Sequence, residues 1–468
     1  MRQFPVLRAG KPYQSVDRVP VQHFLTGEVM GELSMANSGM IPWDIRHKRE
    51  WSQRLSSIGI AQWESIFTRA ANAFECDVLG AFDQSFEDYL DQLSATTGMP
   101  LTLCRKNAAK ISAALREIRP TLQGLMRGMD PSQLEDSRGG VMFRREAACM
   151  GAVLPSNSPG VHSLWLPAIA LKVPVVLKPG RQEPWSPYRI AAALIESGCP
   201  PEAVSIYPTD HAGAREILMN TDRSMLFGDE RTVSPWRGDA RVQIHGPGWS
   251  KVLVGEDMGE EVLAFVDLIE RSVCENSGRS CLNTSSVWTA THGYELADGL
   301  AKRLGAINAL PLNHPQATLS AFAQPEVAKL FSKMVDELLQ TPGAEDMTAK
   351  YREGGRVAVV DGAHFLLPTV VWCSDPDHPL MQMEFLFPFV AVTQVPQGDL
   401  LNHLQETLVA TALTRDEQWI NQLKVAHQID RLNIGPIPTF HIRRDQPHEG
   451  NLFEFLYQQR AYQEERQF

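Results

Sequence analysis

Several features that mark other classes of protein are missing from this chain of 468 residues. Its seven cysteines are odd in number and irregularly spaced, and none of them forms a CxxC pair. This pattern argues against a disulfide framework and against a zinc site. Reduced thiols suit the cytoplasm, so we expect a cytoplasmic protein. The first residues also lack the apolar segment of a signal peptide.

Long apolar runs and an excess of positive charge are missing as well. The longest apolar stretch, Val161 to Leu177, contains His162, Lys172 and two prolines and is too short to span a bilayer. A net charge of −11 argues against a binder of duplex nucleic acid, which needs a basic face. We therefore expect neither a membrane span nor a nucleic-acid partner. The length predicts two or three domains.

The spacing of apolar residues divides the chain into zones. Residues 1–46 are turn-rich, and from His47 to Met126 apolar side chains recur at intervals of three and four, which predicts amphipathic helices. Beyond a turn at Asp130 to Gly140, short apolar runs alternate with helical segments. Alternating strands and helices predict parallel sheets covered on both faces, and hence an α/β protein with two successive α/β domains.

The individual elements follow from the same spacing. The predicted strands are residues 147–154, 173–177, 203–207, 241–244, 251–254, 283–290, 356–360, 389–395, 407–413 and 431–434. The predicted helices are residues 163–171, 187–197, 212–219, 293–304, 324–339 and 418–427. The charged and aromatic tail after Pro438 is typical of a segment that docks onto another surface.

Cys281 lies in the polar turn Glu275-Asn-Ser-Gly-Arg-Ser-Cys281, just before an apolar run. Free cysteines usually fill apolar cores. A tight turn of Asn, Ser and Gly, however, leaves backbone N–H groups able to face a substrate. We therefore interpret Cys281 as a nucleophile.

Four short motifs occur in the order and at roughly the intervals found in one large family. They are Leu154-Pro-Ser-Asn-Ser-Pro-Gly160, Val176-Leu-Lys-Pro-Gly180, Ser277-Gly-Arg-Ser-Cys281 and Glu384-Phe-Leu-Phe-Pro388. In these motifs the chain resembles the aldehyde dehydrogenase superfamily over nearly its whole length. The chain has no G-x-G-x-x-G fingerprint, which members of that family also lack.

The resemblance implies a domain for each zone. Residues 1–254 would form a Rossmann-like NAD(P)-binding domain with an N-terminal helical region, in which residues 128–150 contribute to an oligomerisation hairpin. Residues 255–436 would form the catalytic domain that carries Cys281, and residues 437–468 an oligomerisation arm. A homodimer or homotetramer is expected from this arm.

The resemblance also implies roles for single residues. Cys281 matches the nucleophile, and Asn157 with the Cys281 amide matches the donors to the oxyanion. Lys178 matches a contact to the adenosine ribose, and Glu384 matches the glutamate that holds the nicotinamide ribose. Arg181 stands where many NAD-using relatives carry an acidic residue, and an arginine there suits the 2′-phosphate of NADP.

Taken alone, three of these residues have simpler interpretations. Asn157 is also a typical turn residue, Lys178 a solvated residue at a strand end, and Glu384 a surface carboxylate. The choice between NADP and NAD therefore stays open, with a preference for NADP.

The most consequential departure from the family pattern lies at His245. Hydrolytic relatives carry a glutamate in this register, which activates water to release the acyl group. Without it, a second thiol is the expected acceptor. The segment Gly246-Pro-Gly248 is similar to that of the CoA-acylating and acyl-CoA-reducing branches, and we count Gly246 and Gly248 among the cofactor-binding residues.

A second departure surrounds Gly228, also a candidate for cofactor binding. Leu226-Phe-Gly-Asp-Glu230 replaces a Thr-Gly-Ser turn of the relatives, and Asp229 and Glu230 would repel a phosphate if they pointed at it. In the Glu384 motif, Leu386 replaces an aromatic residue.

Three hypotheses follow for the function. The first is an NAD(P)-dependent oxidoreductase that interconverts an aldehyde and an acyl-CoA through a thioester on Cys281, with CoA as co-substrate. The second is a hydrolytic aldehyde dehydrogenase that forms a carboxylate with His245 as the base. The third is a catalytically idle, structural member of the family.

Overall fold

The computed structural model describes residues 2–79, 83–134 and 141–463 and divides the chain into two compact units. The first unit contains residues 1–97, 104–246 and 442–468, and the second contains residues 98–103 and 247–441. The boundary lies before strand β12 (Ser250–Val254), whereas the sequence placed it after residue 254. Strand β12 belongs to the second unit because it pairs along its length with β13 and β19.

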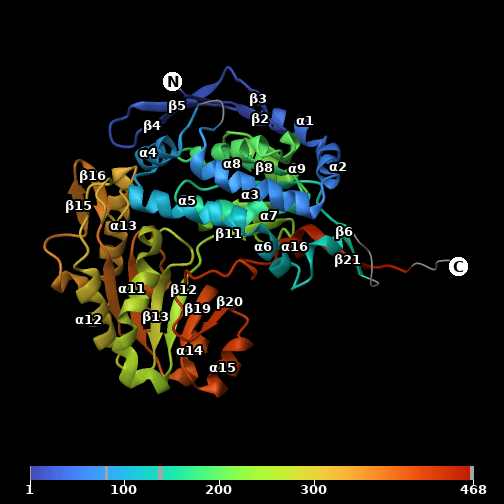
Figure 1. Cartoon of the computed structure of the whole chain (residues 1–468). Coiled ribbons are helices and arrows are strands. Elements are labelled where there is room, and N and C mark those ends of the chain that lie inside the picture. The colour runs from blue at the N-terminus through green and yellow to red at the C-terminus, as the bar shows by residue number, and fades with distance from the viewer. Residues whose placement is uncertain (1, 80–82, 135–140, 464–468) are drawn as a thin grey trace. The chain divides into compact units, whose positions relative to one another are not determined.

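The first unit is built on a sheet with the strand order β11-β10-β7-β8-β9-β2-β3, of which β2, β3, β8 and β11 are labelled in Figure 1. Strands β7 to β11 run parallel, and β2 and β3 close one edge in antiparallel fashion. The strands are β2 (Val6–Arg8), β3 (Lys11–Tyr13), β7 (Met150–Val153), β8 (Val175–Lys178), β9 (Val204–Ile206), β10 (Arg223–Phe227) and β11 (Val242–His245). Helices α7 (His162–Ala170), α8 (Trp185–Glu196) and α9 (His211–Asn220) connect them. The predicted parallel α/β sheet is confirmed.

The N-terminal part of this unit contains more regular structure than its turn-rich sequence indicated. Strands β1 (Arg2–Phe4), β4 (Arg18–Gln22) and β5 (Val29–Ser34) form a separate three-stranded sheet. The helices that follow are α1 (Met40–Ile45), α2 (Lys48–Ser56), α3 (Ile60–Cys76), α4 (Phe86–Thr97), α5 (Leu101–Arg116) and α6 (Ile118–Leu125). Among the described residues, no helix has the length and apolar character that a bilayer crossing requires.

A two-stranded ribbon brings together two segments that lie far apart in the sequence. Strand β6 (Val141–Arg145) pairs in antiparallel fashion with β21 (Tyr457–Ala461), which follows the short helix α16 (Leu452–Leu456) (Figure 1). These strands fall in the two segments for which the sequence predicted an oligomerisation role. Residues 135–140 of the predicted hairpin lie outside the described residues, and the oligomerisation role stays a prediction.

The second unit contains a sheet with the order β14-β17-β18-β13-β12-β19-β20, in which only the edge strand β14 is antiparallel among the described strands. Its strands are β12, β13 (Thr284–Thr289), β14 (Ala344–Asp346), β17 (Thr369–Cys373), β18 (Phe389–Gln394), β19 (Thr407–Leu413) and β20 (Ile429–Ile434). The helices are α11 (Val266–Cys274), α12 (Gly293–Leu304), α13 (Pro325–Leu338), α14 (Gln397–His403) and α15 (Glu417–Lys424).

The two faces of this sheet belong to two separate apolar cores. Val252 and Val254 of β12 pack in the core that contains α11 and α12, and Leu253 between them packs in the core of α13, α14 and α15. Successive side chains of a strand point to opposite faces, so a central strand needs apolar residues at every position. Lys251 breaks this pattern on the face of Leu253.

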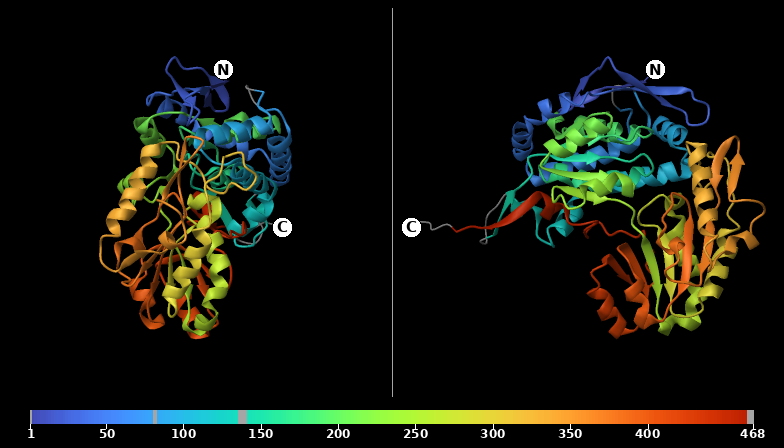
Figure 2. Two further views of the ribbon diagram at one scale, coloured as in Figure 1. Left: turned by 90° about the vertical axis from the view of Figure 1, so that its left-hand side faces the viewer. Right: turned by 180° about the vertical axis from the view of Figure 1, so that it is seen from behind.

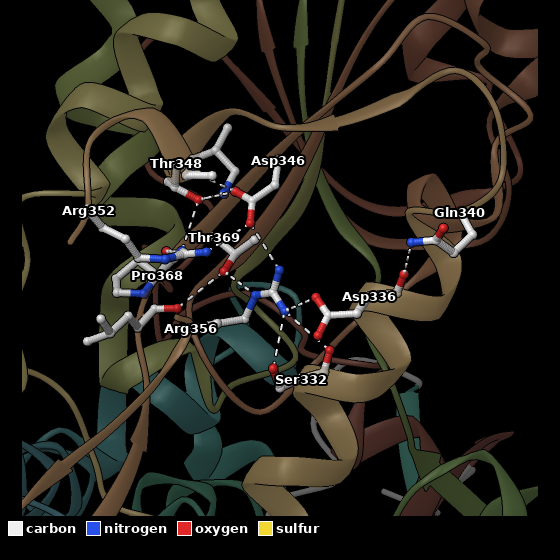
Figure 3. Close-up of polar contacts among 12 residues, drawn as sticks. Ser332, Asp336, Gln340, Asp346, Thr348, Arg352, Arg356, Pro368 and Thr369 are labelled. Carbon is white, nitrogen blue, oxygen red and sulfur yellow. Dashed lines mark hydrogen bonds and ion pairs between the residues drawn. The ribbon is translucent and has the colours of Figure 1, made fainter. Parts of the chain in front are cut away.

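The predicted strand over residues 356–360 exists, but it lies in a separate hairpin of β15 (Val357–Val360) and β16 (Ala363–Leu366). The hairpin packs against α13 (Figure 2). A group of ion pairs around two buried guanidinium groups lies beside it, and we call Asp336, Asp346, Arg352 and Arg356 the arginine cluster (Figure 3). Asp346 accepts from Arg352 at 2.9 Å and from Arg356 at 3.0 Å, and Arg356 also pairs with Asp336 at 2.9 Å.

Candidate active site

The predicted site residues of the first unit lie at one edge of its sheet. Lys178 ends β8, His245 ends β11, and Gly228 directly follows β10. Phe227 pairs in register with His245, and Val153 with Lys178. Asn157, Arg181 and Gly246 follow the ends of β7, β8 and β11. Ligands of parallel α/β sheets bind at this carboxyl edge.

The loop after β8 packs closely against the loop after β7. A side chain at Gly180 would overlap the carbonyl oxygen of Pro155 and the hydroxyl of Ser156. Lys178 is half-buried, and burial lowers its pKa. Arg181 is exposed at the tip of this loop. A half-buried amine beside an exposed guanidinium suits the ribose and phosphate of a dinucleotide, so these side chains fit the implied cofactor.

The acidic pair beside Gly228 is directed into its own helix, α10 (Glu230–Val233). The carboxylate of Asp229 accepts from the backbone N–H of Thr232 at 2.9 Å and from its hydroxyl at 2.6 Å. Glu230 pairs with Arg237 at 2.7 Å. We expected from the sequence that Asp229 and Glu230 would repel a phosphate if they pointed at it. This repulsion is reduced, because both carboxylates have local partners.

His245 is buried, and its ring stacks on Phe227 with centroids 4.4 Å apart. Its Nδ1 lies against the carboxylate of Glu449. Burial, and to a lesser degree the charge of His448, lowers the pKa of His245 well below its ordinary value. Nothing in the polar tail sequence indicated that Glu449 would lie here.

In the second unit, an unusual backbone holds the Cys281 loop. Asn276, Ser277 and Gly278 lie successively in the left-handed region, with φ of 50°, 60° and 69°. A side chain at Gly278 would overlap the backbone of Phe387 and Pro388. Asn283 fixes the other end of the loop, since its side chain accepts from the Ser280 N–H at 2.8 Å and donates to two carbonyls of the preceding segment at 3.0 Å.

The structure brings together Gly248, Cys281 and Glu384, three of the predicted residues. The Glu384 carboxylate accepts from the backbone N–H of Gly248 at 3.0 Å and of Trp249 at 2.6 Å. A side chain at Gly248 would overlap the carbonyl oxygen of Cys281, so the two backbones pass very close to each other. Trp249 has φ of 43°. Successive N–H groups in such a turn form a concave anion site, which the carboxylate fills.

Three ionisable groups of this site, including the thiol itself, have shifted pKa values. Burial raises the pKa of Cys281 to about 12, helped by the charge of Glu384 and opposed by backbone N–H, Ser280 and Arg431. Burial raises the pKa of Glu384 to about 7, against the amides of Trp249 and Gly248 and the charge of Lys251. Burial lowers the pKa of Lys251 to about 7, against the charge of Glu384. We call Gly248, Trp249, Lys251, Cys281 and Glu384 the thiol site.

Sequence reasoning missed Lys251 as a site residue. The only signal was a lysine at the start of a strand that is otherwise apolar. The flanking aromatics of the Glu384 motif, Phe385 and Phe387, are buried in the core of the second unit, whereas Leu386 is exposed. Asn157 belongs to the first unit and Cys281 to the second.

Curated relatives are similar to parts of this chain. An α-ketoglutarate semialdehyde dehydrogenase of Haloferax volcanii is 27% identical over 63% of this chain and 62% of the relative. A malonate-semialdehyde dehydrogenase of Geobacillus kaustophilus is 24% identical over 57% of both chains. The chain thus spans less than two thirds of the length of these relatives. A geranial dehydrogenase of Castellaniella defragrans is 20% identical over 82% of this chain and 80% of that relative.

Solved structures have the same fold over nearly the whole chain. An indole-3-acetaldehyde dehydrogenase in complex with NAD⁺ gives a TM-score of 0.81 at 14% identity, over 99% of this chain and 96% of that chain. A 3,6-anhydro-L-galactose dehydrogenase in complex with NAP gives 0.78 at 14% identity, over 98% and 99%. The sequence model described as the aldehyde dehydrogenase family matches residues 13–451, and the chain therefore belongs to the aldehyde dehydrogenase family.

Proposed function

We propose that this protein is an NAD(P)-dependent aldehyde dehydrogenase that works through a thioester on Cys281 and passes the acyl group to CoA. The observation that carries the proposal is the thiol site, in which a half-buried cysteine lies against a turn that also binds Glu384. Family membership supports the oxidoreductase class.

The reaction begins with a neutral thiol, because burial raises the pKa of Cys281 to about 12. As the sulfur bonds to the aldehyde carbon, the carbon–oxygen double bond becomes a single bond, the oxygen gains negative charge, and the thiol proton passes to solvent. The Cys281 backbone N–H and Asn157 are the proposed donors to that oxygen. Loss of hydride from the same carbon converts the adduct to a thioester.

A nicotinamide dinucleotide supplies the hydride acceptor when it is bound. Lys178 and the turns at Gly228 and Gly246 are proposed to hold it, and the exposed guanidinium of Arg181 favours NADP over NAD. Relatives of the same fold are known in complex with NAD⁺ and with NAP. Gly248 is occupied by the Glu384 carboxylate, so we propose that both contribute to the cofactor site only after this contact opens.

Release to CoA is inferred from position 245, where a buried histidine stands in place of a carboxylate. Its ring stacks on Phe227, which suits packing more than contact with water. The CoA sulfur then attacks the thioester carbon, the bond to Cys281 breaks, and the cysteine regains a proton. The acyl-CoA leaves as product, and the reverse sequence reduces an acyl-CoA to the aldehyde.

A second candidate is hydrolysis, for which two observations speak. The Nδ1 of His245 lies against the Glu449 carboxylate, and a histidine beside a carboxylate is a usual arrangement for a general base. The Haloferax and Geobacillus relatives are semialdehyde dehydrogenases, whose names mention no CoA.

The test is to incubate the protein with aldehydes and NADP or NAD, with and without CoA, and to identify the product. The proposal predicts acyl-CoA, and a loss of turnover of about a thousandfold or more in Cys281→Ala. Hydrolysis predicts a carboxylate without CoA, which His245→Ala abolishes. Undiminished carboxylate formation in His245→Ala would eliminate that base. No nicotinamide absorbance change in any arm, with no cofactor binding by calorimetry, would favour an idle family member.

Assembly as a homodimer or homotetramer through the ribbon of β6 and β21 is also part of the proposal. Sedimentation of the full chain should show more than one copy, and a variant that ends before Tyr457 should sediment as a smaller species. Equal sedimentation of the two proteins would refute this role of the ribbon.

A further inference from the structure

Lys251 is a buried lysine at the thiol site to which the proposed reaction gives no role. Only 1% of the residue is exposed. Its Nζ donates to the carbonyl oxygen of Trp249 at 2.6 Å and to the Thr407 hydroxyl at 2.9 Å. Methionine of similar length would fill the same space without the cost of burying a charge. The ammonium, rather than the volume of the side chain, therefore needs an explanation.

The two acceptors of Lys251 belong to the segments that surround Cys281. Thr407 begins β19, and the next residues of that strand, Leu408 and Val409, pack against Cys281. The N–H of Leu408 donates to the carbonyl of Gly248 at 2.8 Å, which joins β19 to the turn. Lys251 is thus a second link between β19 and the turn, made from within the sheet.

The turn at Gly248 and Trp249 also holds the backbone of Cys281. Ser250 donates its hydroxyl to the Cys281 carbonyl at 2.8 Å, and Gly248 lies against the same oxygen. The pairing of β12 with β13 changes register between Ser250 and Lys251, an irregularity that is frequent beside active sites. Any movement of this turn is therefore transmitted to Cys281.

Trp249 is bound at both ends of its backbone. Its N–H donates to the Glu384 carboxylate at 2.6 Å, and its carbonyl accepts from Lys251 at 2.6 Å. Its φ of 43° is uncommon for a residue other than glycine. Such a conformation persists where the surroundings enforce it, and here the anion and the cation enforce it from the two sides.

We propose that Lys251 is a positioning residue for Cys281 and Glu384. It holds the Gly248–Trp249 turn and the start of β19 at fixed positions, and we call this turn, Lys251 and Thr407 the frame. The frame in turn fixes the positions of the Cys281 loop and of the Glu384 carboxylate. The inference rests on the proposed function only in taking Cys281 as the reacting group.

Within the second unit, the charged and titratable groups around this turn are Lys251, Glu384, Cys281 and Arg431. The charge of Lys251 lowers the pKa of Glu384, and that of Arg431 lowers the pKa of Cys281. An apolar residue at 251 should therefore move the titration of Glu384 to higher pH. A lysine that only filled space would leave that titration where it is.

The test compares the wild type with Lys251→Met, which keeps the length of the side chain and loses its N–H donors. The rate of Cys281 alkylation by iodoacetamide is followed by peptide mass spectrometry over about pH 6 to 9. The exposed Cys76 serves as an internal control. We expect a Cys281 rate that is about tenfold lower, an inflection that moves to higher pH, and an unchanged rate at Cys76.

The same variant should lower kcat for the aldehyde by about tenfold with little change in KM, because the reacting atoms rather than the binding surface are displaced. In Lys251→Ala, added ethylammonium should restore part of the Cys281 rate, and ethanol at the same concentration should not. Rescue by the amine alone identifies the ammonium as the active element.

Wild-type alkylation rate and pH profile in a folded Lys251→Met protein would overturn the inference. If that variant does not fold, Thr407→Val removes one acceptor and keeps the lysine. Slower alkylation in Thr407→Val supports the frame, and an unchanged rate contradicts it. Alkylation needs no aldehyde, so a wild type without aldehyde turnover would refute the proposed function while this readout still decides on Lys251.

Discussion

The arginine cluster and the thiol site both contain buried charges in the second unit, but these charges have different partners. In the arginine cluster, two guanidinium groups pair directly with Asp346 (Figure 3). At the thiol site, the ammonium of Lys251 and the carboxylate of Glu384 bind the carbonyl and the N–H of Trp249. In the arginine cluster the charges pair with opposite charges, whereas at the thiol site they form hydrogen bonds with backbone groups.

The difference appears in the pKa values of the two carboxylates. Burial raises the pKa of Asp346, but Thr348, Arg352 and Arg356 outweigh it, and the pKa lies below its ordinary value. For Glu384 burial prevails, and the pKa rises to about 7. Direct ion pairing keeps a charge fixed, which suits a structural role. A carboxyl group with a pKa near 7 suits a site where protons are transferred.

The largest effect on stability is expected from Arg356→Met. The change removes one of the two arginines that pair with Asp346, and the partner of Asp336. Asp346 keeps Arg352, but the change deletes a buried guanidinium that also donates to Thr369 and Ser332, so the free energy of unfolding should fall by about 3 kcal/mol in urea denaturation. The pH profile of Cys281 alkylation should stay that of the wild type. A loss below about 1 kcal/mol would make this cluster no stronger than a surface pair.

Glu384→Gln should reverse one part of the pH dependence of stability. An unfolded glutamate has a pKa of 4.5 and folded Glu384 a pKa of about 7, so the unfolded chain releases the proton first as pH rises. The wild type therefore loses stability between these values, and the variant does not.

The free energy of unfolding of Glu384→Gln relative to the wild type should grow by on the order of 2 kcal/mol over that window. Asp346→Asn is the contrasting control. The pKa of Asp346 is lowered in the folded protein, so the stability that its carboxylate contributes is lost only as pH falls below about 3.8. Equal pH curves for Glu384→Gln and the wild type would mean that Glu384 is not shifted.

Lys251→Met should remove a gain in the free energy of unfolding that the wild type shows as pH rises. The pKa of lysine is 10.5 when unfolded and about 7 for folded Lys251, so the unfolded chain keeps its proton to higher pH. The wild type therefore gains stability as pH rises above about 7, and the variant lacks this gain. Between about pH 7 and 9 the two should diverge by about 2 kcal/mol in chemical denaturation. Parallel curves would mean that folding does not lower the pKa of Lys251.

The smallest effect is expected at a surface pair of the same unit. Lys333 lies 3.5 Å from Glu337 one helical turn away, with side chains 72% and 63% exposed. Lys333→Met should change the free energy of unfolding by less than about 0.5 kcal/mol. It is a matched control for Arg356→Met, and a larger loss would show that denaturation reports more than the loss of the pair.

Elements with a strong local pattern could be predicted from the sequence. Helix α12 and strand β19 have the predicted bounds of residues 293–304 and 407–413, because α12 has apolar residues at helical spacing and β19 is a nearly continuous apolar run of strand length. Strand β17 was missed, although it lies inside the second sheet. A short apolar run after a proline has no periodicity that separates a buried strand from a loop.

The site could be predicted only where a motif carried it. Cys281, Glu384 and Gly248 were found through family motifs, and the structure brings them together. The membership of β12 in the second sheet could not be predicted, because its partners β13 and β19 lie far along the chain. Lys251 and Glu449 could not be assigned either, since their contacts depend on backbone positions that only the folded chain creates.

The proposed reaction depends on a covalent acyl group at Cys281, which mass spectrometry of the Cys281 peptide detects. The protein is mixed with an aldehyde and NADP or NAD without CoA, quenched in acid and digested. We expect an acyl mass on the Cys281 peptide that disappears when CoA is added before the quench. Continued aldehyde oxidation with an unmodified Cys281, or with the acyl group on another cysteine, would contradict it.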